Sequence, residues 1–167
     1  NDIRNVALVG HGHAGKTSLT AGLLFTAGAT NRLTRADEGS TITDFDDEEI
    51  QRKLSISTGI AYAAWNKKKI NILDTPGYNI FINDTKCAMV AADAALVVVD
   101  GVAGVEVQTE KVWSFATEFK LPRAFAINKL DRERSSFERA LESIQNVFGR
   151  AAVPVQLPIG AEKEFSG

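Results

Sequence analysis

The stretch GHGHAGKT, Gly10 to Thr17, fits the pattern G-x-x-x-x-G-K-[ST]. In this pattern the glycines let the backbone approach an anion closely, and successive N–H groups surround the oxygens of that anion. A match arises by chance in about one chain in two hundred of this length. The stretch therefore predicts a phosphate-binding loop, provided that a strand precedes it and a helix follows it.

The flanking residues supply that context. Residues 4–10, RNVALVG, form a short apolar run typical of a strand, and the leucines of residues 16–28 lie near helical spacing up to Gly28. We expect Lys16 to reach the outer phosphates and the Thr17 hydroxyl to bind Mg²⁺, while the helix N-terminus adds its positive end. The other nucleotide contacts expected in this loop are His11, Gly12, His13, Ala14, Gly15 and Ser18.

Composition limits the class of protein. The 167 residues are 44% hydrophobic, which suits one domain with a core, and no apolar run approaches the ~20 residues of a membrane span. No signal peptide is visible. The net charge of −2 gives no global reason to bind nucleic acid, and the single cysteine, Cys87, excludes an internal disulfide and suits a reducing compartment. We expect a cytoplasmic protein without a membrane segment.

Apolar runs alternate with segments of helical periodicity, which is typical of an α/β domain with a mostly parallel sheet. The helical segments are residues 106–119 and 135–149, and the second of them begins with Ser135 and Glu138, which fit a capping box. The basic residues of NKKK, 66–69, lie where two strands are expected to turn. The expected strands are residues 5–9, 56–65, 69–74, 94–100 and 123–128.

The segment from Thr30 to Lys53 shows no such periodicity. It mixes Gly, Ser and Thr with an acidic run, Asp44 to Glu49. This is long for a structureless connection in a compact domain, and such loops are typically functional. We expect the acidic run to be solvated.

A second motif, DTPG at Asp74 to Gly77, follows the apolar run KINIL. Asp74 is therefore expected at the carboxyl end of a strand, where α/β sheets bind their ligands. We expect Asp74 to hold the Mg²⁺ shell through water. The Gly77 N–H is expected to bond a terminal phosphate and so to sense its loss.

A third motif, NKLD at Asn128 to Asp131, follows the strand RAFAI. The Asp131 carboxylate can accept both N1–H and the 2-amino group of guanine, whereas adenine presents a lone pair at N1. Asn128 can bond the other edge of the base, and the Lys129 stem can lie against its face. Three such motifs in this order predict binding of GTP and GDP.

The motifs resemble those of the GTPase domain of translation elongation factor G over essentially the whole chain. The family's AHIDAGKT, ERGITI, DTPGH and NKMD correspond here to GHGHAGKT, QRKLSI, DTPGY and NKLD. The resemblance implies a P-loop NTPase fold, a mixed and mostly parallel sheet with helices on both faces. It also implies a monomeric, ribosome-dependent GTPase that acts in translocation or ribosome recycling. Contacts to ribosomal RNA would then come from domains outside this sequence.

By the same resemblance, Ser55 occupies the position of the switch threonine, whose hydroxyl binds Mg²⁺ while GTP is present. Serine keeps that hydroxyl. Arg52 could stabilise transition-state charge, as switch arginines do in some GTPases. The alternative for Arg52 is a solvent-exposed arginine, or one directed at a ribosomal phosphate.

Two positions depart from the family. Tyr78 replaces a histidine that is aimed at the attacking water, and tyrosine hydrogen-bonds water without supplying an imidazolium. We expect slower hydrolysis or a different form of assistance, unless Tyr78 only packs against the following helix. His13 replaces an aspartate, which removes a carboxylate from any monovalent-cation site beside the phosphates.

The predicted organisation is a GTP-binding domain over residues 1–152, without the last nucleotide motif and the C-terminal strand and helix of the family. Residues 153–167 resemble the start of the subdomain that the family inserts. Alternatives are a GTP-gated ribosome-binding factor with little hydrolysis, and a ribosomal-protection protein or release factor 3-like GTPase. A P-loop small-molecule kinase is a third possibility, against which DTPG and NKLD argue.

Overall fold

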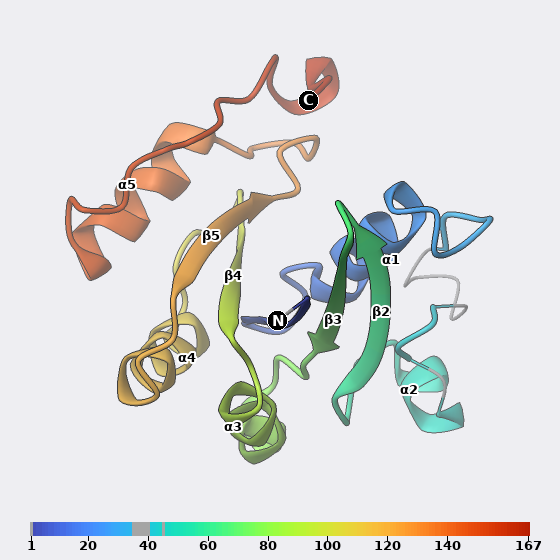
Figure 1. Cartoon of the computed structure of the whole chain (residues 1–167). Helices are drawn as coiled ribbons and strands as arrows, with labels where there is room; N and C mark the ends of the chain where they lie inside the picture. Colours follow the sequence, from blue (N-terminus) through green and yellow to red (C-terminus); the bar gives the residue numbers. More distant parts are fainter. Residues whose placement is uncertain (1, 35–40, 45) are drawn as a thin grey trace.

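A five-stranded sheet organises the part of the chain that the computed structural model describes, residues 2–34, 41–44 and 46–167 (Figure 1). The strand order is β2-β3-β1-β4-β5, with β2 antiparallel to β3 and all other neighbours parallel. The prediction of a mixed, mostly parallel sheet is therefore confirmed. The strands are β1 (Ile3–Gly10), β2 (Gly59–Trp65), β3 (Lys68–Asp74), β4 (Ala94–Asp100) and β5 (Arg123–Asn128).

Helices cover both faces of the sheet, as predicted (Figure 1). Helix α1 packs on β1, β2 and β3 from one side, whereas α3 and α4 pack on the other side and α5 lies beside β5. The helices are α1 (Lys16–Thr26), α2 (Asp47–Arg52), α3 (Ile82–Val90), α4 (Val107–Glu118) and α5 (Phe137–Phe148), with short 3-10 turns η2 (Asn79–Phe81) and η3 (Glu162–Glu164). None of the helices in the described residues has the length and apolarity needed to cross a membrane.

The sheet has a hydrophobic core on each face because neighbouring residues of a strand point to opposite sides. Leu8 packs toward α1 in one core, while the adjacent Val9 packs toward α3 and α4 in the other. Three successive valines of β4, residues 97–99, are all fully buried. This run is typical of a parallel strand covered on both faces, and it holds the carboxyl end of β4 rigidly beside that of β1.

Helix α5 begins one residue later than the sequence predicts. Its N-cap is Ser136, whose Oγ accepts a hydrogen bond from Arg139 N at 3.2 Å. Ser135, the predicted cap, is buried and donates to the carbonyl oxygen of Leu130 at 2.7 Å. The predicted pairing of Ser135 with Glu138 is therefore wrong, because the Ser135 hydroxyl donates its hydrogen bond within the loop that follows β5.

The acidic run before β2 is not uniformly solvated, which corrects the sequence-based expectation. Glu49 is only 1% exposed, and Asp44 is partly buried, whereas Asp47 and Glu48 are exposed. The run folds into α2, where Asp46 accepts a hydrogen bond from Glu48 N at 2.9 Å and forms a capping box with Glu49. Residues 35–40 and 45, which belong to the predicted functional loop, lie outside the described residues.

Candidate functional site

The predicted phosphate loop connects β1 to α1 at the carboxyl edge of the sheet. Two of its glycines are required by geometry. Gly10 has φ 144°, and a Cβ there would overlap the carbonyl group of Val98 on β4. Gly15 is the N-cap of α1 with φ 92°, and a Cβ there would overlap the amide of Asn128. The loop therefore fits closely between β4 and the segment that follows β5.

Lys16 lies within this loop and is only 6% exposed. Its Nζ donates hydrogen bonds to the carbonyl oxygens of His11 at 2.8 Å and Gly10 at 3.3 Å. Burial lowers the pKa of Lys16 to about 8, because the ammonium loses its hydration. An anion in the loop would supply the negative charge that this buried ammonium needs.

The DTPG segment packs directly on the phosphate loop. Parallel pairing places Asp74 of β3 opposite Leu8 of β1, so both segments leave the same edge of the sheet. A Cβ at Gly77 would lie 2.6 Å from both Gly12 N and His11 O. Only glycine allows this approach, which brings the Gly77 backbone to the end of the loop where the Lys16 ammonium lies.

Asp74 is a buried carboxylate with one oxygen in use. Its Oδ2 accepts a hydrogen bond from Thr43 Oγ1 at 2.7 Å, while Oδ1 has no hydrogen-bond partner within the described structure. Burial raises the pKa of Asp74 to about 6, against the opposing effects of the Thr43 hydroxyl and the Lys16 charge. A buried carboxylate oxygen without a partner is a natural ligand for a cation or for its bound water.

Two hydroxyls lie close together beside the phosphate loop. Thr17 Oγ1 and Ser55 Oγ are 3.3 Å apart, and Ser55 Oγ donates to Asp44 Oδ1 at 2.8 Å. Burial raises the pKa of Asp44. The group offers oxygen donors alone, and in the described residues no three His, Cys, Asp or Glu side chains gather as a metal cluster. Hydroxyls with one or two carboxylates fit Mg²⁺, which takes its remaining ligands from phosphates and water.

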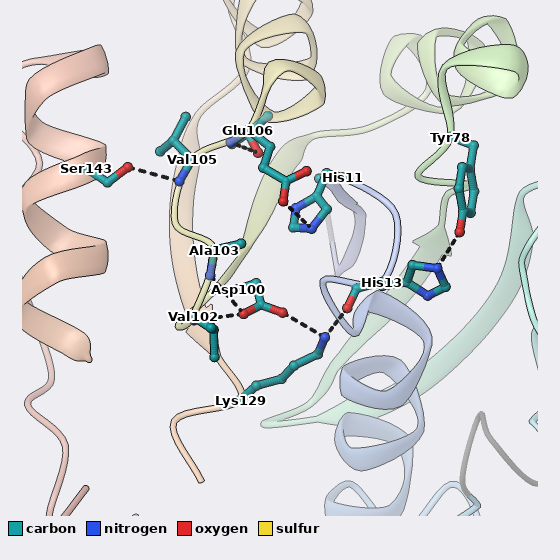
Figure 2. Close-up of polar contacts among 12 residues, drawn as sticks. His11, His13, Tyr78, Asp100, Val102, Ala103, Val105, Glu106, Lys129 and Ser143 are labelled. Atoms are coloured by element: carbon teal, nitrogen blue, oxygen red, sulfur yellow. Dashed lines mark hydrogen bonds and ion pairs between the residues drawn. The ribbon is translucent and has the colours of Figure 1, made fainter. Parts of the chain in front are cut away.

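The NKLD segment also contacts the phosphate loop. Asn128 Nδ2 donates to the carbonyl oxygen of Ala14 at 3.0 Å. Lys129 Nζ donates to Asp100 Oδ2 at 2.8 Å and to the carbonyl oxygen of His13 (Figure 2). The NKLD segment and the phosphate loop are thus joined by hydrogen bonds within the protein itself.

Asp100, which the sequence analysis did not single out, anchors this connection. Burial alone would raise its pKa, but the hydrogen bonds from Lys129 and from two backbone amides outweigh burial and hold the pKa of Asp100 below its ordinary value. Its position at the carboxyl end of β4, directly after the valine run, is the signal that could have identified it.

The two histidines of the loop point in different directions (Figure 2). His11 is buried, with Nε2 3.3 Å from Glu106 Oε1, and desolvation lowers the pKa of His11 although the Glu106 charge acts against it. His13 faces Tyr78, with Nε2 2.5 Å from the phenol oxygen. His11 was expected at the nucleotide, but its side chain packs toward the start of α4.

A cavity of about 620 Å³ lies over these segments, a volume suited to a small-molecule ligand. It is lined by much of the phosphate loop, by Ser55, by Gly77 with Tyr78, and by Lys129. Among the residues that the sequence analysis missed, Asp44 and Arg132 also line it. The predicted residues that do not line it are His11, Ala14, Arg52, Asp74, Asn128 and Asp131.

Arg52 and Asp131 are the predicted residues that the structure does not bring into the cluster. Arg52 Nη2 is 2.7 Å from Glu48 Oε1, one turn earlier in α2, and its side chain is 62% exposed. Asp131 is exposed, next to the cavity-lining Arg132. Asp74 and Asn128 do not line the cavity. Asp74 is hydrogen-bonded to Thr43, and Asn128 is hydrogen-bonded to Ala14 of the phosphate loop.

A phosphate loop, a buried carboxylate at the end of the neighbouring strand and an Asn-Lys-x-Asp segment hydrogen-bonded to that loop define a P-loop nucleotide-binding domain. Comparison with known proteins narrows this class. The chain belongs to the family of the elongation factor Tu GTP binding domain, which matches residues 1–164.

Several full-length relatives share this domain. The chain is 39% identical over 166 residues to a mitochondrial ribosome-releasing factor 2 from Culex quinquefasciatus, covering 99% of this chain and 22% of the relative. It is 36% identical over 166 residues to an elongation factor G from Mycoplasma pneumoniae, covering 99% and 24%. A crystal structure of a Thermus thermophilus protein superposes with a TM-score of 0.92 at 39% identity, covering 99% and 25%.

These comparisons confirm the resemblance to elongation factor G. The chain spans about a quarter of the length of the relatives that it matches.

Proposed function

We propose that the protein is a ribosome-dependent GTPase of the elongation factor G type, which binds GTP and GDP with Mg²⁺ and uses hydrolysis to drive translocation or ribosome recycling. The observation that carries the proposal is the convergence of three nucleotide motifs on one cavity through direct contacts to the phosphate loop. The names of the relatives favour this function over the alternatives of a protection protein or a release factor.

The phosphates would lie along the loop that precedes α1. The backbone N–H groups from Gly12 to Ser18 and the Lys16 ammonium would hold their oxygens, together with the positive end of the helix. The Gly77 N–H would bond the terminal phosphate, because this glycine already lies against Gly12 and Lys16. Loss of the terminal phosphate would then release the segment that follows β3.

Mg²⁺ would be held by the hydroxyls of Thr17 and Ser55, with Asp74 acting through water. The unpartnered Oδ1 of Asp74 and its raised pKa support this assignment, because a nearby cation would stabilise the carboxylate in its charged form. The ion would neutralise the charge of the outer phosphates. Asp44, which accepts from Ser55, would orient the Ser55 hydroxyl toward the ion.

Guanine would bind at the carboxyl end of β5. The exposed Asp131 carboxylate would accept the N1–H and the 2-amino group, Asn128 would bond the other edge, and the Lys129 stem would lie against the base. The ammonium of Lys129 is already committed to Asp100 and to the loop, so its stem is held in a fixed direction.

Tyr78 would stand near the attacking water and would support slower hydrolysis than the family's histidine does. The role of Arg52 at the transition state stays a prediction, and it requires that the ion pair with Glu48 be broken. The whole protein would act as a monomer in the cytoplasm. Its domains beyond this chain would contact ribosomal RNA, and residues 153–167 would begin the inserted subdomain after a GTP-binding domain of residues 1–152.

The test is single-turnover hydrolysis of radiolabelled GTP by the full-length protein, with and without ribosomes. We expect ribosomes to stimulate the wild type, Lys16→Ala to abolish hydrolysis, and Tyr78→His to accelerate it. GTP that stays intact with the wild type but is hydrolysed by Tyr78→His would instead identify a GTP-gated binding factor.

A matched experiment tests the base. Asp131→Asn should weaken binding of GDP and allow xanthosine diphosphate to bind, because xanthine has a carbonyl oxygen where guanine has the 2-amino group. Unchanged GDP affinity in this variant would contradict the assignment of Asp131.

A further inference from the structure

The two positions at which the loop motifs depart from the family are in contact with each other. Tyr78 Oη lies 2.5 Å from His13 Nε2, and the two rings meet edge-on, with an interplanar angle of 87° and centroids 5.6 Å apart (Figure 2). One residue comes from the phosphate loop and the other from the segment after β3. The contact therefore joins the phosphate loop to the residue that follows the DTPG motif.

The backbone fixes both partners. His13 has φ 63°, and its carbonyl oxygen accepts the hydrogen bond from Lys129 Nζ. Tyr78 follows Gly77, whose backbone packs against the phosphate loop. The Tyr78 ring also lies close to Gly12, since a Cβ added at Gly12 would be 3.1 Å from the nearest ring carbon of Tyr78. The imidazole and the phenol are thus held at one place over the loop.

Both side chains line the same cavity as Lys16 and Gly77. Under the proposed function, Lys16 and Gly77 mark the end of this cavity that takes the terminal phosphate. Tyr78 directly follows Gly77 and its ring approaches Gly12, so under that function the phenol lies near this end, where His13 is its polar contact.

We propose that His13 is the positioning residue for Tyr78: its imidazole Nε2 accepts the phenol hydrogen bond and holds the phenol oxygen over the outer-phosphate end of the cavity. The inference rests on the proposed function for the meaning of that position. Where the family has a carboxylate and an imidazole, this chain has an imidazole and a phenol, and one hydrogen bond joins them.

The first test is a double-mutant cycle on ribosome-stimulated, single-turnover GTP hydrolysis by the full-length protein. Loss of one typical hydrogen bond corresponds to about a 2- to 12-fold change, so His13→Ala should lower the rate by about this factor. His13→Gln should restore much of the rate, because its amide oxygen can accept from the phenol. In a Tyr78→Phe background, His13→Ala should cause no further loss. Equal losses in both backgrounds, or a faster His13→Ala enzyme, would overturn the inference.

The second test does not depend on hydrolysis. Fluorotyrosine placed at Tyr78 should give a ¹⁹F resonance that shifts in His13→Ala and returns toward the wild-type position in His13→Gln. The matched control is His11→Gln, which changes the histidine that faces Glu106 and should leave the resonance in place. A resonance that ignores His13 refutes the pair. A resonance that responds to His13 while the wild type leaves GTP intact retains the pair and refutes the proposed function.

Discussion

Replacing Asp100 should loosen the phosphate loop even though Asp100 does not line the cavity. Asp100 Oδ1 accepts hydrogen bonds from Val102 N at 2.8 Å and Ala103 N at 3.3 Å, and Oδ2 accepts from Lys129 Nζ at 2.8 Å (Figure 2). Asp100→Asn can keep the first two bonds, but its amide group then faces the Lys129 ammonium. The substitution therefore removes the ion pair and leaves the turn after β4 intact.

The magnitude follows from the geometry. At 2.8 Å and an effective dielectric constant of about 20, the attraction of the two charges is about 6 kcal/mol before desolvation. Removing one partner of a buried pair costs about 3–5 kcal/mol. The side chains of Lys129 and Asp100 keep 14% and 10% exposure, so we expect the lower end, about 3 kcal/mol. In a domain of this size that corresponds to a fall in Tm of about 6–12 °C.

The assay is urea denaturation followed by tryptophan fluorescence, for which Trp113 is a local probe because it stacks on Phe125 of β5 at 4.8 Å. The free energy of unfolding is compared for wild type, Asp100→Asn, Lys129→Met and the double variant. We expect the double variant to be less destabilised than the sum of the single variants by about 2 kcal/mol. Losses that add to within about 0.5 kcal/mol would refute the reasoning, since the two side chains would then stabilise the fold independently.

Three further substitutions test other parts of the site. Glu49→Ala removes the acceptor of two backbone amides beside the Ser55 segment, and it should cost about 2–3 kcal/mol in urea denaturation and weaken Mg²⁺-dependent GTP binding. Glu49→Gln should retain most of both properties, and equal losses in the two variants would contradict the role of the hydrogen bonds. Gly77→Ala should reduce affinity for fluorescent GTP by about tenfold and affect GDP less, because a Cβ would lie 2.6 Å from the phosphate-loop backbone; equal losses for GTP and GDP would refute this. Burial lowers the pKa of His11 below its ordinary value of 6.5, so the unfolded chain takes up this proton at a higher pH than the folded protein does. The free energy of unfolding therefore falls as the pH drops below 6.5, and it stops falling once the pH is below the pKa of the folded state. The free energy of unfolding of the wild type relative to His11→Gln should therefore decrease between about pH 8 and pH 5, and a constant difference would refute the linkage.

The parts of the site that follow from the sequence are those encoded within a few consecutive residues. A glycine loop between a strand and a helix fixes the place of Lys16 and Thr17, because strand and helix periodicity surround it directly. Asp74 and Asn128 follow from the same logic, since parallel strands bring their carboxyl ends to one edge.

The parts that the sequence did not predict depend on contacts between distant segments. Glu49 and Glu48 are chemically alike and adjacent, yet Glu49 is buried because the chain before β2 folds back and presents two amides to it. Similarly, the sequence does not show that His11 and His13 face different partners, because Glu106 and Tyr78 come from distant segments of the chain. Composition indicated a solvated acidic run because exposure is the usual state of such residues.

The contacts among the motifs have a consequence for binding. The carbonyl oxygens of His13 and Ala14 are held by Lys129 and Asn128, and the backbone of Gly77 packs against the other end of the same loop. These hydrogen bonds restrain the carbonyl groups of the loop through contacts within the protein itself. A restrained loop loses less conformational entropy when it binds phosphate. The affinity for phosphate therefore also depends on residues that restrain the loop without contacting the phosphate. The base motif and the phosphate loop therefore act as one mechanical unit, and a change at the base end should alter phosphate binding as well.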